Sequence, residues 1–117
     1  VVIGALAGVH QFCRVGRGAM IGGLSAVVAD VIPMGMVIGE RANLDGLNLI
    51  GLKRAGVNKD HINGLRAAFK MIFQSNNNVK DTIEPALDAY KGNPLVEEMI
   101  SFIKSETSRS LTISSKD

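Results

Sequence analysis

The sequence predicts a β-solenoid built from short triangular coils, followed by a bundle of helices. Two observations predict this combination. Aliphatic residues recur at every sixth position from Ile3 to Val27, and from about Asn43 onward helical spacing and helix-capping residues replace that period. We therefore assign the coils to residues 1–42 and a helical domain to residues 43–117.

The six-residue period carries the prediction of a coil. It matches neither the 3.6-residue period of an amphipathic helix nor the alternation of a half-buried strand. We expect each unit to form one short strand and a corner, with an aliphatic side chain inside the coil and a small side chain near the corner. Three such units would complete one turn. The aliphatic positions are Ile3, Val9, Val15, Ile21 and Val27, and the small ones are Ala7, Cys13, Ala19, Ser25 and Val31.

The coils are expected to continue upstream of Val1. The repeat units of this chain make fewer than two turns, whereas repeat proteins bury their core between neighbours and need about three repeats or more. An unstacked coil would also expose strand edges and apolar core. The repeat is expected to stop near Pro33, which cannot donate a ladder hydrogen bond. Met34–Gly39 is then predicted as a last, irregular strand that leaves the coil.

A short helix and then a longer one are expected after residue 43. Leu44, Leu47 and Leu52 predict the short helix, which ends at Gly56. Asn58 is a favourable N-cap residue for the second helix. The apolar residues of that helix recur at helical spacing and predict its buried face: Ile62, Leu65, Phe69, Ile72 and Phe73.

Two further helices are expected before the C-terminal tail. Asn78 should cap the third helix, which contains Pro85, and Asn93 should cap the fourth, with Pro94 as its first residue. The tail after Ser105 is rich in Ser, Thr and charge and is expected to fray. The apolar residues are Ile83, Leu87 and Tyr90 in the third helix and Val96, Met99, Ile100 and Ile103 in the fourth.

Composition excludes several classes of protein. A net charge of +2, without an Arg/Lys run interleaved with aromatic residues, argues against nucleic-acid binding. No uninterrupted apolar run reaches the roughly 18 residues of a membrane span. The single cysteine, Cys13, agrees with a reducing cytoplasm, and its small corner position predicts a buried, inert thiol. His10 and His61 lie on different elements without a Cys partner, so no metal site is predicted.

Four segments carry a resemblance to a known family. They are, in order, Val9–Cys13 (VHQFC), Met20–Gly23 (MIGG), Asp30–Pro33 (DVIP) and Gly46–Arg54 (GLNLIGLKR). Together they resemble the C-terminal portion of the bacterial UDP-N-acetylglucosamine O-acyltransferases, which are acyl-carrier-protein-dependent, hexapeptide-repeat enzymes of the lipid A pathway. The resemblance is detailed from Val2 to about Ile72 and holds in outline through the remaining helices.

The resemblance implies both a fold and an activity. The fold is a left-handed parallel β-helix followed by a helical bundle, in a cytoplasmic homotrimer. The enzyme moves a (R)-3-hydroxyacyl chain from acyl carrier protein to the 3-position of UDP-N-acetylglucosamine, the first step of lipid A biosynthesis, and needs no cofactor. The family's general-base histidine lies in an upstream coil, in an Ala-His-Asp-like setting that neither His10 nor His61 occupies. This chain would therefore carry no catalytic residue and would be inactive alone.

The resemblance further implies a nucleotide-sugar site made by His10, Gln11, Asn48 and Arg54. His10 follows the inward Val9, so strand alternation turns it outward; a surface histidine in a trimer contact is the alternative. Arg54 would bind the UDP phosphates through its planar guanidinium; a solvated charge at a helix end is the alternative. Asn48 matches a position near the uracil, and a helix-stabilising role is the alternative.

Two departures from the family leave fewer nucleotide contacts. Ala55 stands where the family commonly has a second Arg, so Lys53 would share the phosphate role. Ile50 replaces a polar residue that is often found beside the uracil. Weaker nucleotide binding is the alternative to a phosphate role shared with Lys53.

Acyl-chain length is expected, from the same resemblance, to depend on Met20, Gly23 and Arg41. The absent side chain of Gly23 would leave the acyl groove open, and ordinary corner geometry is the alternative reason for this glycine. An acidic carrier protein would be attracted to basic residues of the helical domain, although acidic residues lie among them. These basic residues are Lys59, Arg66, Lys70, Lys80, Lys91 and Lys104.

Two other functions stay open at this point. One is another hexapeptide-repeat acyltransferase, which acylates the amine of UDP-glucosamine or uses acetyl-coenzyme A; such enzymes are expected to lack the VHQFC and GLN…LKR segments. The other is a non-catalytic module for trimerisation or carrier binding. Within the main interpretation, the acceptor can be N-acetylglucosamine or its 3-amino variant.

Overall fold

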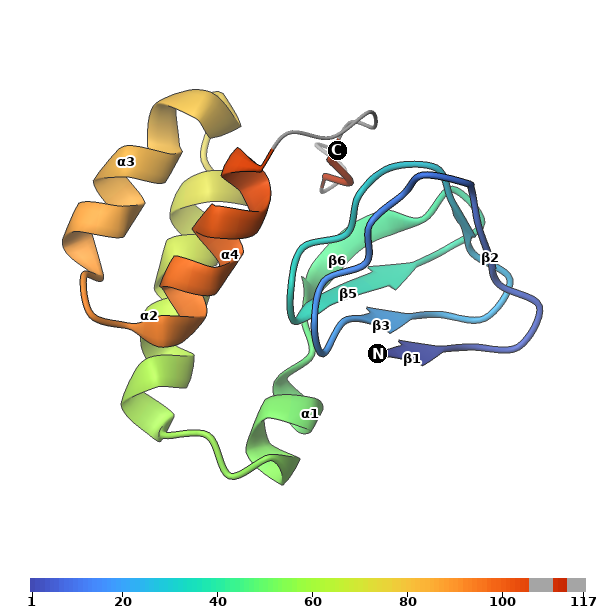
Figure 1. Cartoon of the computed structure of the whole chain (residues 1–117), viewed down its shortest axis with the longest axis horizontal. Coiled ribbons are helices and arrows are strands. Elements are labelled where there is room, and N and C mark those ends of the chain that lie inside the picture. The colour runs from blue at the N-terminus through green and yellow to red at the C-terminus, as the bar shows by residue number, and fades with distance from the viewer. Residues whose placement is uncertain (106–110, 114–117) are drawn as a thin grey trace.

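A triangular β-coil lies beside a bundle of helices in the computed structural model, which describes residues 1–105 and 111–113 (Figure 1). Buried side chains of the coil and of the bundle belong to one continuous apolar core. None of the helices within residues 1–105 has the length and apolar character needed to cross a membrane. The helices are α1 (Leu49–Arg54), α2 (Lys59–Phe73), α3 (Val79–Ala89) and α4 (Pro94–Lys104).

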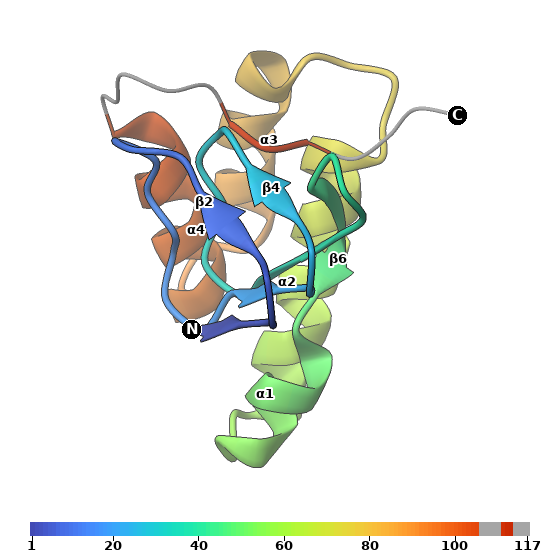
Figure 2. The same cartoon turned by 90° about the vertical axis from the view of Figure 1, so that its right-hand side faces the viewer.

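Parallel strands stack on the faces of the coil, as the six-residue period predicts (Figure 2). The chain returns to the same face after each turn, so the predicted solenoid is confirmed. The third face has isolated parallel bridges in place of a strand pair, between Val15 and Val31 and between Asp30 and Leu111. The first face holds β1 (Val2–Ile3), β3 (Met20–Ile21) and β5 (Gly35–Ile38), and the second holds β2 (Gly8–Val9) and β4 (Ala26–Val27).

The second turn of the coil is two residues shorter than the first. Val9 pairs with Val27, 18 residues later, but Val15 pairs with Val31, only 16 residues later. The two residues are lost at the corner between Val27 and Val31. Val31 therefore stacks on an aliphatic position, and its assignment to the small corner position is wrong. The cause is a long-range pairing that local spacing does not reveal.

Corner residues adopt the left-handed backbone conformation. In a residue with a side chain this conformation costs about 1–2 kcal/mol, so the stacking of neighbouring turns must hold it. Only one corner residue of this kind is glycine, which explains why composition does not mark the corners. Their φ angles are 60° at Leu6, 67° at Phe12, 71° at Gly18, 64° at Leu24 and 62° at Met34.

The segment after the repeat does not leave the coil. β5 stacks on β3 in parallel, and a turn at residues 39–42 leads into β6 (Asn43–Leu47), which pairs with β5 in the antiparallel sense. The prediction of a departing strand is wrong, and so is the start of the first helix at Leu44. Leu44 is buried opposite Val37 in this hairpin, so its apolar character serves the sheet. The division of the chain at residues 42 and 43 stays a prediction.

The longer helices form where capping residues and apolar spacing predict them. The Asn58 side chain accepts hydrogen bonds from the backbone of Asp60 and His61, and Asn93 does the same for Leu95 and Val96. Asn78 stands at the N-cap of α3 without a side-chain cap bond, so only its position is confirmed. The expected buried face of α2 is confirmed at Ile62, Leu65, Phe69, Ile72 and Phe73.

Part of the tail returns to the coil. Thr112 donates its backbone N–H to the carbonyl of Asp30 (2.7 Å) and its hydroxyl to that of Ala29 (3.1 Å). Leu44 donates its backbone N–H to the carbonyl of Ile113 at 3.0 Å. Fraying is thus wrong for residues 111–113, whose partners are 69 or more positions away in the sequence. The rest of the expected frayed tail lies outside the described residues.

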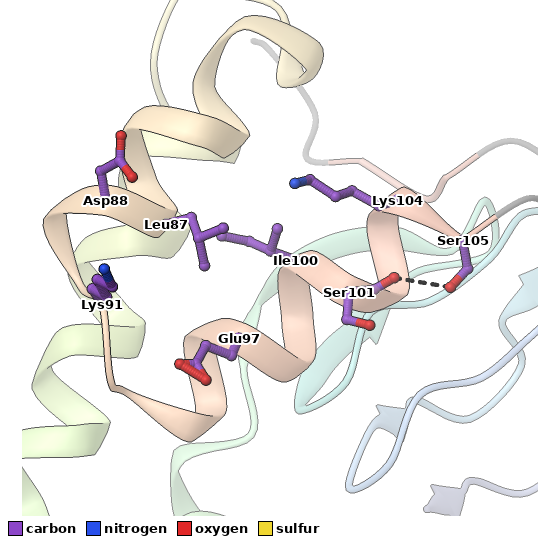
Figure 3. Close-up of a pocket in the computed structure, with 8 residues that line it drawn as sticks. All are labelled: Leu87, Asp88, Lys91, Glu97, Ile100, Ser101, Lys104 and Ser105. Atoms are coloured by element: carbon purple, nitrogen blue, oxygen red, sulfur yellow. Dashed lines mark hydrogen bonds between the residues drawn. The ribbon is translucent and has the colours of Figure 1, made fainter.

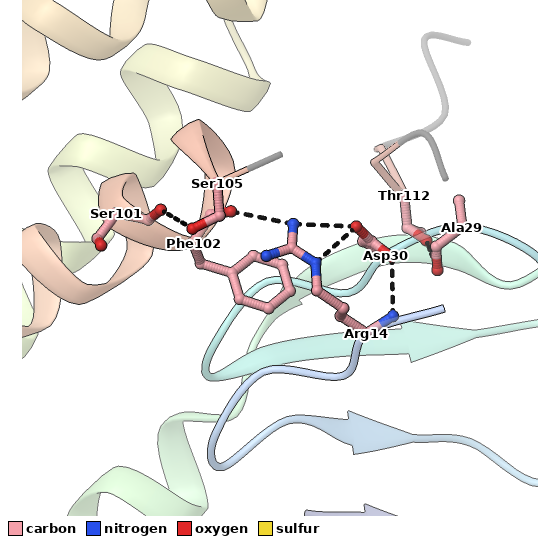
Figure 4. A network of polar contacts seen from close by, with 7 residues as sticks. All are labelled: Arg14, Ala29, Asp30, Ser101, Phe102, Ser105 and Thr112. Atoms are coloured by element: carbon pink, nitrogen blue, oxygen red, sulfur yellow. Dashed lines mark hydrogen bonds and ion pairs between the residues drawn. The ribbon is translucent and has the colours of Figure 1, made fainter. Parts of the chain in front are cut away.

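A polar network joins the coil to α4 (Figure 4). Asp30 is fully buried and accepts hydrogen bonds from the backbone N–H (2.8 Å) and the Nε (3.0 Å) of Arg14. The same guanidinium donates to the carbonyl of Phe102 (3.1 Å) and lies 4.2 Å from the centroid of its ring. Arg14 therefore connects two turns of coil with the end of α4.

A second ion pair crosses the same boundary nearer to solvent. Arg17 donates Nε and Nη2 to the carboxylate of Glu98, at 2.9 and 2.6 Å. These hydrogen bonds raise the pKa of the Arg17 guanidinium above its usual range. Sequence reasoning assigned no role to Arg14 or Arg17. Each of them is a charged residue within the repeat, and the six-residue pattern by itself assigns no partner to such a charge.

Candidate functional site

The predicted site residues are distributed over different corners of the coil. Three corners alternate with the three faces, because each turn of chain passes each face once. His10 and Gln11 occupy the corner after β2, Gly23 the corner after β3, and Asn48 packs against the corner after the third face. A single chain therefore does not gather these residues into one cleft.

His10 and Gln11 are exposed at a corner that is longer than the corner stacked on it. The first corner takes six positions from Val9 to Val15, whereas the stacked corner takes four from Val27 to Val31. His10 Nδ1 lies 3.4 Å from the backbone oxygen of Gln11. Both side chains lie at the surface of the coil, which is the orientation that strand alternation predicts for His10.

The residues expected to set acyl length lie around another corner. Gly23 is exposed, and a Cβ added there would lie 3.1 Å from the carbonyl oxygen of Ala5. The turn that contains Arg41 runs beside this corner, where Ala26 donates its backbone N–H to the carbonyl of Glu40 at 3.0 Å. Met20 lies on β3, three residues earlier, and is 38% exposed. These residues can therefore line one surface of the coil.

Arg54 and Lys53 end the short helix α1, which extends away from the coil (Figures 1 and 2). Both side chains are exposed, while Leu52 just before them is fully buried. Two cations in the last turn of a helix also suit its dipole. Lys53 and Arg54 therefore present positive charge to solvent, and the buried Leu52 just before them anchors this end of the helix.

The side chain of Asn48 makes hydrogen bonds to other residues of this chain. Its Oδ1 accepts a hydrogen bond from the backbone N–H of Gly51 at 3.1 Å and so caps α1. Its Nδ2 donates to the carbonyl of Gly18 at 3.0 Å. A primary amide has a second N–H and a second lone pair, so these bonds leave it capacity for a ligand. The helix-stabilising role considered for Asn48 is confirmed by these contacts.

A basic pocket of about 420 Å³ lies between α1 and α2. Its charged lining residues are Lys53, Lys59 and Arg66, and its apolar lining includes Leu49 and Val57. Because no carboxylate lines it, the pocket favours an anionic group attached to an apolar one. It shares Lys53 with the segment that carries Arg54.

A larger cavity of about 660 Å³ lies between α3 and α4 (Figure 3). Leu87 and Ile100 supply its apolar surface, and acidic Asp88 and Glu97 share its rim with Lys91. Because acidic and basic residues share its rim, this cavity does not favour a ligand of one charge over the other. None of the residues proposed for nucleotide or acyl binding lines it. Within residues 1–105 and 111–113, no group of three or more His, Cys, Asp or Glu side chains is placed to hold a metal ion.

The sequence and the fold both match one family of proteins. The family model described as UDP N-acetylglucosamine O-acyltransferase, domain 2, matches residues 30–112. A protein of Paracoccus denitrificans named acyl-[acyl-carrier-protein]–UDP-N-acetylglucosamine O-acyltransferase is 47% identical over 110 residues, which are 94% of this chain and 41% of that protein. A protein of the same name from Rhizobium etli is 41% identical over 96% of this chain and 41% of its own length.

A solved structure agrees with these relatives. The UDP-N-acetylglucosamine acyltransferase from Campylobacter jejuni superposes with a TM-score of 0.87 at 35% identity, over 97% of this chain and 44% of that one. The chain thus spans about two fifths of the length of the curated relatives it matches. The resemblance found in the sequence is confirmed.

Proposed function

The chain belongs to the UDP-N-acetylglucosamine O-acyltransferase family, and from this we propose that the full-length protein acylates UDP-N-acetylglucosamine. It would transfer a (R)-3-hydroxyacyl chain from acyl carrier protein to the 3-position of the sugar, as the first step of lipid A biosynthesis in the cytoplasm. Agreement of sequence and fold over nearly the whole chain carries this proposal. Residues 1–42 would be the C-terminal coils of a longer left-handed β-helix, and residues 43–117 its helical domain.

In the proposed reaction, the 3-hydroxyl oxygen of the sugar attacks the carbonyl carbon of the acyl thioester. A histidine in an upstream coil takes the hydroxyl proton as general base. The C–O ester bond forms, the C–S bond breaks, and the protonated histidine returns the proton to the sulfur, so that the carrier leaves as its thiol. His10 and His61 are not assigned this role, so residues of this chain would bind and orient the substrates only.

We propose that the active protein is a homotrimer whose sites lie between neighbouring coils. The distribution of His10, Gly23 and Asn48 over different corners supports this arrangement. In a threefold assembly, one corner of a coil faces a different corner of its neighbour. Residues that are separated within one chain would then line the same cleft.

The nucleotide sugar would bind His10, Gln11 and Arg54, with Asn48 beside them. Arg54 would contact the diphosphate, because an exposed guanidinium gives two parallel N–H donors to phosphate oxygens. Lys53 would add charge where Ala55 offers no guanidinium. The second N–H and the second lone pair of the Asn48 amide would permit a contact with the uracil.

Acyl carrier protein would dock on the basic pocket between α1 and α2. Lys59 and Arg66 lie on α2 and face the same space as Lys53. An acidic carrier would be drawn to this charge, and the effect would weaken as salt is added. The apolar lining residues would suit a pantetheine arm more than a hydrated ion.

The function is tested by assaying the full-length protein with defined acyl-carrier thioesters and with both acceptors, N-acetylglucosamine and its 3-amino variant, linked to UDP. Arg54→Ala should raise the KM for the nucleotide sugar roughly tenfold or more, because charge-assisted hydrogen bonds to phosphate are lost. Arg66→Ala is the matched control and should raise the KM for acyl carrier protein instead. Equal effects of Arg54→Ala on both substrates would count against its phosphate role, and no acyl transfer to either acceptor would refute the activity.

The proposed acyl ruler is tested by Gly23→Met. The new side chain would project from an exposed corner. Its Cβ would lie 3.1 Å from the carbonyl oxygen of Ala5, so that neighbour would have to move by only a few tenths of an ångström. We expect the preferred acyl chain to become shorter, measured with a series of carrier thioesters. Gly46→Met is the control, because an added Cβ at Gly46 meets nothing within 4 Å and the residue is not part of the proposed ruler. An unchanged chain-length profile for Gly23→Met would remove Gly23 from the site.

A further inference from the structure

We propose that Asn48 is a positioning residue, which fixes helix α1 against the coil and thereby places Arg54. This inference rests on the phosphate-binding role proposed for Arg54. It assigns to Asn48 an effect on substrate binding that does not require contact between Asn48 and the substrate.

Three hydrogen bonds hold Asn48 where the coil meets α1. Its backbone N–H donates to the carbonyl of Met34 at 2.7 Å, and its Nδ2 donates to the carbonyl of Gly18 at 3.0 Å. Gly18 and Met34 are the left-handed residues of one corner in successive turns, 16 residues apart. Asn48 therefore binds two stacked turns at once, while its Oδ1 accepts the N–H of Gly51 in α1.

Helix α1 depends on such an anchor because it is short. Its six residues span only about 9 Å, and an isolated helix of this length is unstable in water. Besides Asn48, the fully buried Leu52 fixes it to the core. Arg54 is two positions after Leu52, so a rotation of α1 about its axis would move the guanidinium away from its place.

Gly51 shows how closely Asn48 folds over the first turn of α1. A Cβ added to Gly51 would lie 2.6 Å from Nδ2 and 2.9 Å from Cγ of Asn48. Any side chain at Gly51 would therefore displace the amide from Gly18. The Gly18–Asn48–Gly51 contact thus needs a glycine in a helix interior, where glycine costs about 1 kcal/mol relative to alanine.

The first test compares Asn48→Ser with Asn58→Ser in the full-length protein. Serine keeps the N-cap acceptor at either position, but at position 48 it is too short to reach Gly18. Asn58 caps α2 with its oxygen in the same way, which makes it the matched control. We expect Asn48→Ser to raise the KM for UDP-N-acetylglucosamine about three- to tenfold, the loss expected for one hydrogen bond. The KM for acyl carrier protein should rise less, because Lys59 and Arg66 of the proposed carrier pocket lie on α2, and the values for Asn58→Ser should stay unchanged.

A second measurement separates positioning from direct contact. If Asn48 acts through Arg54, Asn48→Ser should raise the KM less in an Arg54→Ala background than in the wild type. Gly51→Ala, which keeps the amide but displaces it, should behave like Asn48→Ser. Fully additive losses in the double variant would mean that Asn48 acts on the substrate independently of Arg54, and would overturn the proposal.

Amide hydrogen exchange of residues 49–54 provides a readout that does not depend on activity. Asn48→Ser should accelerate exchange in α1, and Asn58→Ser should not. Unchanged exchange in Asn48→Ser overturns the positioning role whatever the kinetics are. Faster exchange in a protein whose KM is insensitive to Arg54→Ala would instead refute the phosphate role of Arg54 and leave the anchor in place.

Discussion

The first and second turns of the coil follow the same six-residue rule but differ in burial. In the first turn, Ile3 is 52% and Val9 is 38% exposed. One turn later, Ile21 and Val27, which pair with them, are each 1% exposed. The side chains are equivalent in type and position, so the difference comes from what is stacked on each side.

This contrast shows that the repeat fixes the direction of a side chain and stacking fixes its burial. In the second turn, β3 lies between β1 and β5, and Ala26 of β4 donates a hydrogen bond to Glu40 in the turn of the β5–β6 hairpin. The strands of the first turn each pair on one side only. In a solenoid each turn contacts only its neighbours. The stability contributed by an aliphatic position therefore depends on the turns beside it.

The largest expected effect is that of truncating an aliphatic residue of the second turn. Ile21→Ala should destabilise the 117-residue chain by about 2–5 kcal/mol, because it opens a cavity in a closed part of the core. Ile3→Ala, the matched substitution one turn earlier, should cost less than about 1 kcal/mol, since half of that side chain is already in water. Denaturant unfolding measures both values.

The same pair of variants tests the proposed upstream coils. In the full-length protein a further coil would cover Ile3, and Ile3→Ala should then cost as much as Ile21→Ala. Equal losses in the 117-residue chain would contradict the role of stacking. A small loss for Ile3→Ala in both proteins would contradict the proposed upstream coil.

The contact between the turns at Asp30 should have the next largest effect. Asp30→Asn replaces an acceptor oxygen of a fully buried carboxylate with an NH2 group that faces the N–H donors of Arg14. We expect a loss of about 1–3 kcal/mol in the free energy of unfolding. Asp45→Asn on the exposed side of β6 is the control and should stay within about 0.5 kcal/mol of the wild type. Equal values for the two variants would show that the Arg14 network does not stabilise the fold.

The smallest effect is expected for the outer ion pair. The Arg17 side chain is 63% exposed and that of Glu98 is 33% exposed, and water screens such pairs to about 1 kcal/mol or less. Arg17→Met should therefore change the melting temperature little, and added salt should remove the difference. A loss as large as that of Asp30→Asn would show that this pair fixes α4 to the coil as strongly as the Arg14 network does.

Local patterns predicted much of the fold. The six-residue period gave the coil, and the caps Asn58 and Asn93 gave the starts of α2 and α4. The first helix was predicted too early, because Leu44 fits a strand as well as a helix when its pairing partner Val37 is unknown. Val31 was misplaced for a similar reason, since a shortened turn changes the pairing without changing the residue types.

The candidate site was predicted in its residues but not in its arrangement. Motifs identified His10, Gly23, Asn48 and Arg54 one by one, and their roles as substrate contacts stay predictions. Their distribution over separate corners follows from the register of the turns. The bonds that anchor Asn48 to the coil join it to Met34 and Gly18, 14 and 30 positions away, so no local spacing could have indicated them.

The sequence by itself determined the coil and the helices α2 and α4, because the period of aliphatic residues and the capping residues act within a few positions of the chain. The tertiary structure decided which side chains are buried, where a turn is shortened, and how Asn48 and Arg14 join the coil to the helices. Those features depend on hydrogen bonds and packing between residues that are far apart in the chain. Their free energy appears only when the turns are stacked.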